Sequence, residues 1–298
     1  MRSRTMTLVF LGLCATTAFA QRTFVSVTGV DNATCSRSAP CRSFGAAVTA
    51  VAAGGEVVAL DSGGYGGLTI TKSISIIAPS GVYAGVTVAS GTGITISVPA
   101  GIVTLRGLSI NGVGGTTGIQ VDSIGQLHVE NTLISGLVSD GMLVNAATLF
   151  LVRDCVIRAN AQGINIPNAA SGITGMVERT RLDENTAAGA TIRDNAAVDF
   201  SDTTFFNNTD GIVLIPASVG AIAFVNHCFF DRGSRGIVLQ TTLDTTSATT
   251  VVGDSTFYHV NDPVHRGGIG SNTAFTFANN QFSGYSYTPT FDTILTLK

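Results

Sequence analysis

Apolar residues return at a nearly constant interval through the second half of the chain. Eight segments start from an equivalent apolar residue and carry another five positions later, and the starts lie 24, 23, 25, 23, 24, 28 and 25 residues apart. The starting residues are Leu105, Val129, Val152, Val177, Phe200, Phe224, Val252 and Phe277. The second residues are Ile110, Ile134, Ile157, Leu182, Phe205, Phe229, Phe257 and Phe282. We expect both sets to point into one core, as in stacked repeats.

Two further positions define the repeat unit. Two residues after each start lie residues that mostly tolerate a left-handed backbone, which predicts a tight corner: Gly107, Asn131, Asp154, Arg179, Asp202, Asn226, Asp254 and Asn279. Upstream, most repeats contain a glycine followed by an alternating apolar run, at Gly118, Gly141, Gly163, Gly189, Gly211 and Gly236. Each repeat is therefore predicted to hold three short strands, one after the glycine, one ending at the start residue and one after the corner.

Three short strands cannot bury their apolar faces alone, so the repeats are expected to stack, with each strand pairing with its copies above and below. At this point the sequence resembles the right-handed parallel β-helix repeat proteins of the pectate-lyase-like superfamily, over roughly residues 24–282. The resemblance rests on the recurrent pattern apolar, any, Asn or Asp, polar, any, apolar, and on the N-terminal run Phe24-Val-Ser…Pro40-Cys-x-Ser-Phe44. It implies an all-β, right-handed parallel β-helix. It implies no single activity, because the superfamily contains lyases, hydrolases, epimerases and adhesins.

The N-terminal residues indicate export and a capping element. A basic start, a short apolar run and a small-x-small site predict a signal peptide over residues 1–20, and hence a secreted or periplasmic protein without membrane insertion. Residues 21–56 are expected to form an extended segment and a short capping α-helix that begins after Ser43. Residues 57–298 are expected to form the β-helix with a C-terminal tail, as one domain with the cap.

Cysteine spacing separates one bridge from two free thiols. Cys35 and Cys41 are six residues apart in a chain expected to be exported, which predicts a disulfide. Cys155 and Cys228 lie three repeats apart, about 14 Å along the expected stack, whereas bridged Cα atoms must be within about 7 Å. They are therefore expected to be free.

The charge balance argues against nucleic acid and anionic membranes as partners. The chain has 16 basic and 19 acidic residues, a net charge of −3. Loss of Arg2 and Arg4 with the signal peptide would make this 14 − 19 = −5. Both kinds of partner require clustered positive charge. No zinc spacing, phosphate loop or dinucleotide fingerprint occurs, so neither a metal nor a cofactor is expected.

The outward positions of the first strand are poor in catalytic groups. They are expected to be Gln120, Leu143, Asn165, Thr191, Val213 and Val238, followed by Asp122, Asn145, Pro167, Arg193, Ile215 and Gln240. The resemblance implies that polysaccharide lyases and hydrolases of this shape would place carboxylates here, with a basic residue nearby. Hydrolysis requires two carboxylates, and only one aspartate is present. No catalytic residue is therefore predicted on this face.

Other polar groups have structural and functional interpretations. Five acids and one arginine lie in neighbouring turns: Arg181, Asp183, Glu184, Asp194, Asp199 and Asp202. Catalysis or calcium binding by this group is kept as an alternative to surface ion pairs. Glu130, Arg153 and Glu178 share an outward slot and predict a charge ladder across strands. His227 is expected in an inward column of small polar residues.

The binding site predicted from the sequence is aromatic. Phe206, Phe230 and Tyr258 each follow the expected inward column by one residue and should face outward on three adjacent coils. Such a strip suits sugar rings, with Asn208 and Arg232 alongside for hydroxyl contacts. The alternative is that the tail over residues 283–298 covers the strip. If exposed, the strip, or the face of Val213, Ile215 and Val238, would suit self-association into a homo-oligomer.

Three functions follow as hypotheses. The first is a secreted, non-catalytic protein that binds glycans, with polysaccharide as its partner, or that acts as a cell-surface or structural element. The alternative is a polysaccharide lyase, hydrolase or epimerase with carboxylates placed in the turns. The third is a homomeric adhesin or fibre module.

Overall fold

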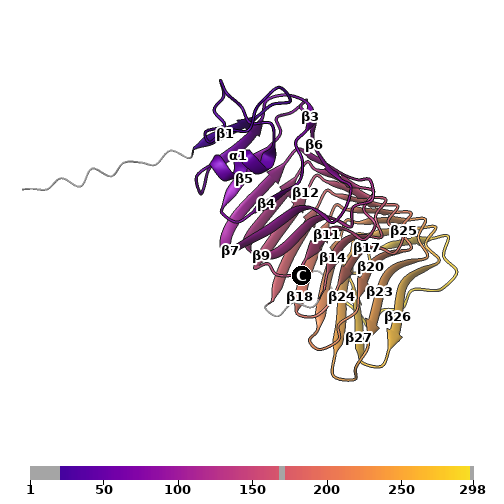
Figure 1. The fold of residues 1–298 in the computed structure, drawn as a ribbon. Coiled ribbons are helices and arrows are strands. Elements are labelled where there is room, and N and C mark those ends of the chain that lie inside the picture. The colour runs from indigo at the N-terminus through magenta and orange to yellow at the C-terminus, as the bar shows by residue number, and fades with distance from the viewer. Residues whose placement is uncertain (1–20, 168–171, 296–298) are drawn as a thin grey trace, which may run out of the picture.

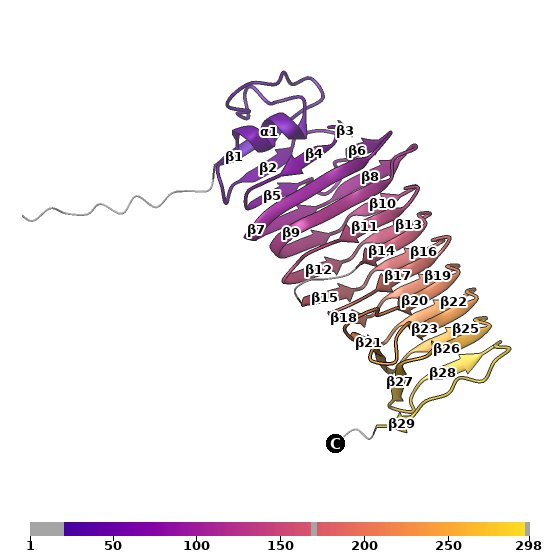
Figure 2. The same cartoon turned by 60° about the horizontal axis from the view of Figure 1, so that its bottom comes forward.

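The chain winds into a parallel β-solenoid of about nine turns, here called coils (Figures 1 and 2). The computed structural model describes residues 21–167 and 172–295, so the expected signal peptide lies outside the described residues. One short helix, α1 (Phe44–Ala50), occurs within those ranges. The predicted fold class is confirmed. In these same ranges no helix has the length and apolarity needed to cross a membrane.

The strands are short and follow one another around each coil. They are β1 (Arg22–Val25), β2 (Glu56–Ala59), β3 (Gly63–Gly64), β4 (Leu68–Ile70), β5 (Ile74–Ile77), β6 (Ala84–Val88), β7 (Thr92–Arg106), β8 (Leu108–Gly112), β9 (Thr117–Glu130), β10 (Leu133–Ser135), β11 (Asp140–Val144), β12 (Leu149–Arg153), β13 (Val156–Arg158), β14 (Gln162–Ile166) and β15 (Ile173–Glu178). They continue with β16 (Arg181–Asp183), β17 (Ala188–Ile192), β18 (Ala196–Ser201), β19 (Thr204–Phe206), β20 (Asp210–Leu214), β21 (Ala221–Asn226), β22 (Phe229–Asp231), β23 (Arg235–Thr241), β24 (Ser247–Gly253), β25 (Thr256–Tyr258), β26 (Asp262–Gly268), β27 (Ser271–Thr276), β28 (Gln281–Ser283) and β29 (Thr293–Ile294).

Each coil contributes three strands that pair in parallel with their counterparts in the next coil. The third strands form a ten-stranded sheet in the order β28-β25-β22-β19-β16-β13-β10-β8-β6-β3. The first and second strands belong to one 19-stranded sheet, because β7 and β9 run through both positions without a break. Figure 2 shows the successive coils stepping along one axis from β6 to β28.

The helix α1 covers the N-terminal end of this stack (Figure 1). The Ser43 side chain accepts a hydrogen bond from the backbone N–H of Ala46, which caps the helix as the sequence predicts. Phe44 is fully buried, and its ring lies 5.0 Å from that of Tyr65, centroid to centroid. The helix therefore closes the apolar interior of the first coils.

The apolar ladder is confirmed in its first five coils and, in the later ones, at Val252, Phe257 and Phe282. It is one residue off at three positions. Val225, not Phe224, pairs with Phe200, and Phe230, not Phe229, pairs with Phe205. Thr276, not Phe277, pairs with Val252. The expected inward position of Phe229 is wrong, because Phe229 is 39% exposed while Phe230 is 1% exposed.

The size of the side chain that immediately follows the corner decides this register. The small inward residue after the corner bonds to a carbonyl of the preceding coil, as Thr203 does to Val177 and Cys228 does to Phe200. His227 is too large for that position. It occupies the left-handed corner instead, with φ at 51° and an exposed side chain, so its expected place in the inward column is wrong.

The glycine before each first strand makes room for this ladder. A Cβ on Gly211 would lie 2.7 Å from the Phe230 ring and 2.5 Å from the carbonyl oxygen of Gly236. Real Cβ contacts are essentially never closer than 3.0 Å. The recurrent glycine is therefore required by packing.

The cysteine predictions are confirmed. Cys35 and Cys41 form a disulfide, with Cα atoms 4.8 Å apart. Cys155 and Cys228 are free and buried.

Candidate functional site

The predicted aromatic strip is not continuous, because Phe230 lies in the core. A one-residue shift of register moves every side chain of a strand to its other face, and this shift places Phe230 inward, against expectation. Phe206 is partly exposed and Tyr258 is exposed, and both face outward from the ten-stranded sheet. Two of the three predicted rings are therefore on the surface.

Asn208 is also buried, which contradicts its expected outward role. Its Oδ1 accepts hydrogen bonds from the backbone N and the Nδ2 of Asn185, at 2.9 and 3.0 Å. Its Nδ2 donates to the carbonyl oxygen of Leu182 at 2.6 Å. Asn160 makes the equivalent bonds to Asn185. These stacked amides satisfy backbone groups inside the second corner of these coils.

The outer face of the ten-stranded sheet carries one column that contains both exposed rings. Strand pairing aligns Asp183, Phe206, Asp231 and Tyr258 on four consecutive coils, and we call these residues the Phe206 column. Arg232 stands beside it, with its guanidinium carbon 5.6 Å from the centroid of the Phe206 ring. Arg232 therefore lies at the strip, as expected, but over a ring.

The described part of the C-terminal tail covers the end of the stack. β29 pairs with β27, and the Phe291 ring lies 6.1 Å from that of Phe282, the last ring of the ladder. Tyr285 and Tyr287 remain exposed. This part of the tail caps the apolar interior.

The residues that the sequence predicts on the outer face of the first strands form neither a catalytic pair nor an exposed apolar surface. Asp122 accepts hydrogen bonds from Gln120 and Asn145, at 2.9 and 3.0 Å, as a surface amide network. Val213 and Val238 are both buried. The suggested self-association face of Val213, Ile215 and Val238 is therefore not available.

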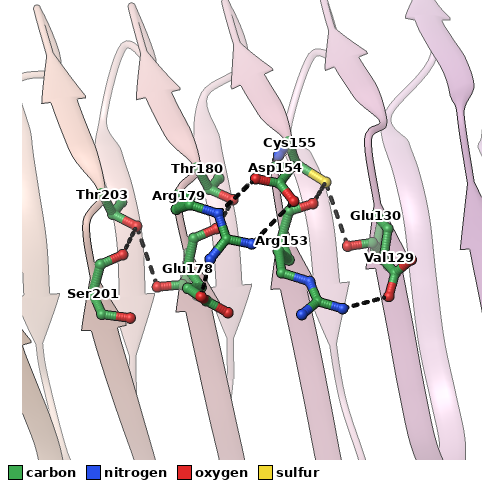
Figure 3. A network of polar contacts seen from close by, with 11 residues as sticks. Val129, Glu130, Arg153, Asp154, Cys155, Glu178, Arg179, Thr180, Ser201 and Thr203 are labelled. Carbon is green, nitrogen blue, oxygen red and sulfur yellow. Dashed lines mark hydrogen bonds and ion pairs between the residues drawn. The ribbon is translucent and has the colours of Figure 1, made fainter.

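The predicted charge ladder is present in part, between Glu130 and Arg153, on the outer face of the second strands (Figure 3). Glu130 accepts hydrogen bonds from Arg106 at 2.7 Å and from Arg153 at 3.0 Å. Burial alone would raise the pKa of Glu130, but these two arginines outweigh it and lower the pKa. Glu178 pairs instead with Arg179, the corner residue that also bonds Asp154.

The acids expected to form a second cluster are separated. Asp194 accepts backbone N–H groups of residues 217–219 and so fixes a loop. Asp183 is on the ten-stranded sheet and bonds Arg181. Asp199 is on β18, in the other sheet. Within residues 21–167 and 172–295, no three His, Cys, Asp or Glu side chains are grouped as a metal site would need.

Asp199 lies between two exposed apolar side chains. Pairing places Met176 of β15 and Phe224 of β21 on either side of Asp199, on three consecutive coils. Met176 is 42% exposed and Phe224 is 45% exposed. Burial raises the pKa of Asp199, and within the described chain no hydrogen bond reaches its carboxyl group. We call the outer face of β12, β15, β18, β21 and β24 the groove face.

An open groove of about 460 Å³ runs beside these residues, at the starts of the same strands. Every residue that lines it is uncharged: Thr148, Gly172, Ile173, Thr174, Asn195, Ala196, Ala197, Val219, Gly220, Ile222, Ser247 and Thr249. The groove therefore offers hydroxyl and amide groups beside an apolar surface.

Sequence reasoning missed this surface because it assigned Phe224 to the core. Both residues are apolar in the doublets Phe224-Val225 and Phe229-Phe230, so hydrophobicity alone could not show which residue of each doublet points inward. The unusual 28-residue step from Phe224 to Val252 was the available signal. With Val225 in the column, the steps around it become 25 and 27 residues.

Comparison with known proteins gives a family and a fold. A family model described as "Right handed beta helix region" matches residues 92–282. No curated protein matches the chain. An alginate lyase from Paenibacillus sp. str. FPU-7 superimposes with a TM-score of 0.66 and 14% identity, over 93% of this chain and 99% of that one. At this identity the likeness is one of fold.

Two further solved structures are more distant. Pectate lyase Pel9A has a TM-score of 0.49 and 14% identity, over 87% of this chain and 78% of that one. A GH136 lacto-N-biosidase from Eubacterium ramulus has a TM-score of 0.46 and 11% identity, over 93% and 68%.

Proposed function

The chain belongs to the right-handed β-helix family, and from that premise we propose that it binds a neutral polysaccharide along the groove face. The observation that carries the proposal is the alignment of Met176, Asp199 and Phe224 beside an open groove. Exposed apolar side chains with a few polar groups are what sugar rings require, since a sugar presents apolar C–H faces and polar edges. A face that crosses several coils suits an extended polymer.

The charges favour a neutral polymer over a uronate. A uronate chain needs cations to neutralise its carboxylates, and no charged residue lines the groove. The arginines of the ladder on this sheet are already engaged, Arg153 by Glu130 and Arg179 by Asp154 and Glu178. Residues 168–171, which follow β14, are Asn-Ala-Ala-Ser and add no charge. The alginate lyase of similar fold acts on an acidic polymer, so the two proteins would differ in ligand class.

The test is binding to immobilised polysaccharides. Xylan, β-glucan and galactan represent neutral chains, and alginate and polygalacturonate represent acidic ones. Phe224→Ala should weaken neutral-chain binding at least about fivefold, as expected for a central aromatic contact. Tyr287→Ala removes an exposed ring from the tail and is the matched control. Preference for the acidic chains, or equal binding by both variants, would overturn the proposal.

A second candidate function is hydrolysis of such a chain, and the environment of Asp199 favours it. Glu178 pairs with Ser201, so it lies one coil before Asp199 and two residues further along the strand. Ideal strand geometry puts the two Cα atoms about 8 Å apart on one face of the sheet. From there the two side chains can reach the separation of about 6.5–9.5 Å that the carboxyl groups of inverting glycosidases require. Protonated Asp199 would give its proton to the glycosidic oxygen as the glycosidic C–O bond breaks. Glu178 would take a proton from the water whose oxygen bonds to the anomeric carbon.

Turnover separates the two functions. The hydrolase predicts that reducing ends appear in neutral polysaccharide, and that Asp199→Asn abolishes their release while binding persists. The binding function predicts no release by either protein.

We also propose that the protein acts outside the cytoplasm. The Cys35–Cys41 disulfide supports this, because such bridges persist in oxidising compartments. Mass spectrometry of protein recovered from the periplasm and the medium tests it: a chain that starts at Gln21 is expected, and exclusively cytoplasmic protein starting at Met1 would contradict it.

A further inference from the structure

We propose that the Phe206 column is a second sugar-binding site, on the ten-stranded sheet, where hydroxyl groups of a neutral sugar donate to Asp183 and Asp231. This site lies on a different sheet from the groove face and does not depend on the function proposed above. Phe206 supplies the flat apolar surface on which the sugar ring rests.

The two aspartates lie on either side of the Phe206 ring. Asp183 pairs with Phe206 across β16 and β19, and Phe206 pairs with Asp231 across β19 and β22. Neighbouring parallel strands are about 4.8 Å apart, so one carboxylate lies one strand before the ring and the other one strand after it. A sugar ring stacked on Phe206 would bring its hydroxyl groups toward both.

Each aspartate has a buried oxygen that lacks a hydrogen-bond donor. Asp183 is 5% exposed; its Oδ2 bonds Arg181 at 2.7 Å, while its Oδ1 has no partner within the described chain. Asp231 likewise has an unpartnered Oδ1, with His259 Nδ1 3.7 Å away. Both Oδ1 atoms are almost completely covered, so a sugar hydroxyl group reaches them only when the side chains around them move. Buried acceptors without donors are destabilising, so a ligand that then supplies donors gains free energy here.

The chemistry of these atoms selects the class of ligand. Both unpartnered atoms are carboxylate oxygens, which accept hydrogen bonds. Sugar hydroxyl groups can donate to both, whereas the carboxylate of a uronate would be repelled by both. Burial, with Glu184 adding to it, raises the pKa of Asp183, as expected for a carboxyl that is short of donors. A neutral sugar is therefore favoured.

Arg232 occupies the position that the sugar would take. Its guanidinium carbon lies 5.6 Å from the Phe206 centroid, and its side chain is largely exposed and so is free to move away. Binding must displace this cation–π contact. Removing Arg232 should therefore tighten binding by about two- to fivefold, the equilibrium equivalent of an exposed contact of this kind.

The experiment uses protein with the Phe224→Ala change, so that the groove face contributes little. Isothermal titration with xylohexaose, cellohexaose and laminarihexaose is expected to detect binding of at least one. Phe206→Ala should then abolish that binding, and Phe206→Leu, which keeps apolar volume without a flat ring, should weaken it strongly. Asp183→Asn should weaken it, and Arg232→Ala should strengthen it. Tyr287→Ala is the control.

Three results would overturn the proposal: no binding of any hexaose to the Phe224→Ala protein, equal binding by the Phe206→Leu protein, or weaker binding after Arg232→Ala. The groove proposal fails on a different observation, because it requires Phe224→Ala alone to reduce the binding of neutral polymers. Thermal unfolding of each variant confirms that the fold is retained.

Discussion

Phe205 and Phe230 stack face to face, with ring centroids 4.5 Å apart and planes only 3° from parallel. Phe230 makes the same contact with Phe257 on the other side. It is therefore the central ring of a column, whereas its neighbour in sequence, Phe229, points outward.

Phe230→Ala should lower the free energy of unfolding by about 3–5 kcal/mol, because it removes a buried ring and leaves a cavity between two others. Phe229→Ala should change it by about 1 kcal/mol or less, because that ring is partly exposed. Equilibrium urea denaturation of the two variants measures the contrast. Equal losses, or a larger loss for Phe229, would show that the register of the later coils is different.

Sequence patterns predicted the fold and most of the apolar ladder correctly, but placed Phe224 and Phe229 inward in place of Val225 and Phe230. The inward face of a strand can be read from the sequence where polar and apolar residues alternate, as they do around Val129 and Val152. At Phe229-Phe230 both neighbours are apolar, so the choice depends on whether His227 or Cys228 fits against the backbone of the preceding coil. That is a packing constraint between residues far apart in sequence.

The same limit explains the candidate sites. Asp199 was recognised as an acid in a turn region, but its apolar neighbours Met176 and Phe224 come from other coils and depend on the register. The burial of Val238 was also hidden, because alternation gives the direction of a side chain and not what covers it. By contrast, the Cys35–Cys41 bridge depends on local spacing and was predicted correctly.

Gly175 faces the interior directly above the Phe150 ring. A Cβ at this position would lie 2.2 Å from the ring carbon Cζ, and the backbone has no positive φ that would itself require glycine. Gly175→Ala should therefore destabilise the protein by overpacking, by about 1–3 kcal/mol. Gly45→Ala in α1 meets no atom within 4 Å and should stabilise it by about 0.4–1 kcal/mol. Denaturation curves that gave the same sign for both changes would contradict the packing at Phe150.

Asp199 should make the stability of the protein depend on pH. Burial raises its pKa above the ordinary value of 3.8, so the native carboxyl keeps a proton that the unfolded chain has already released. The native state therefore loses stability as the pH rises from that value through the folded pKa. Asp199→Asn should increase the free energy of unfolding at pH 7 and leave it nearly unchanged at pH 3.

Urea denaturation at the two pH values tests this, with Asp244→Asn in an exposed loop as the control. Destabilisation by Asp199→Asn at pH 7 would mean that the carboxylate has a stabilising partner, and would weaken its assignment as a proton donor.

Cys155 and Cys228 should be unreactive in the native protein. Burial raises the pKa of both thiols to about 12, and each sulfur donates to a backbone carbonyl of the preceding coil. The thiolate is the nucleophile, so at pH 8 the native chain starting at Gln21 should not react with a thiol reagent such as DTNB. Unfolding in guanidinium without reductant should release two thiols, and prior reduction should release four, because Cys35 and Cys41 are bridged. Zero thiols in the unfolded, unreduced chain would mean that Cys155 and Cys228 are bridged to each other. Because three coils separate these residues in the structure, that result would contradict the stacking of the coils.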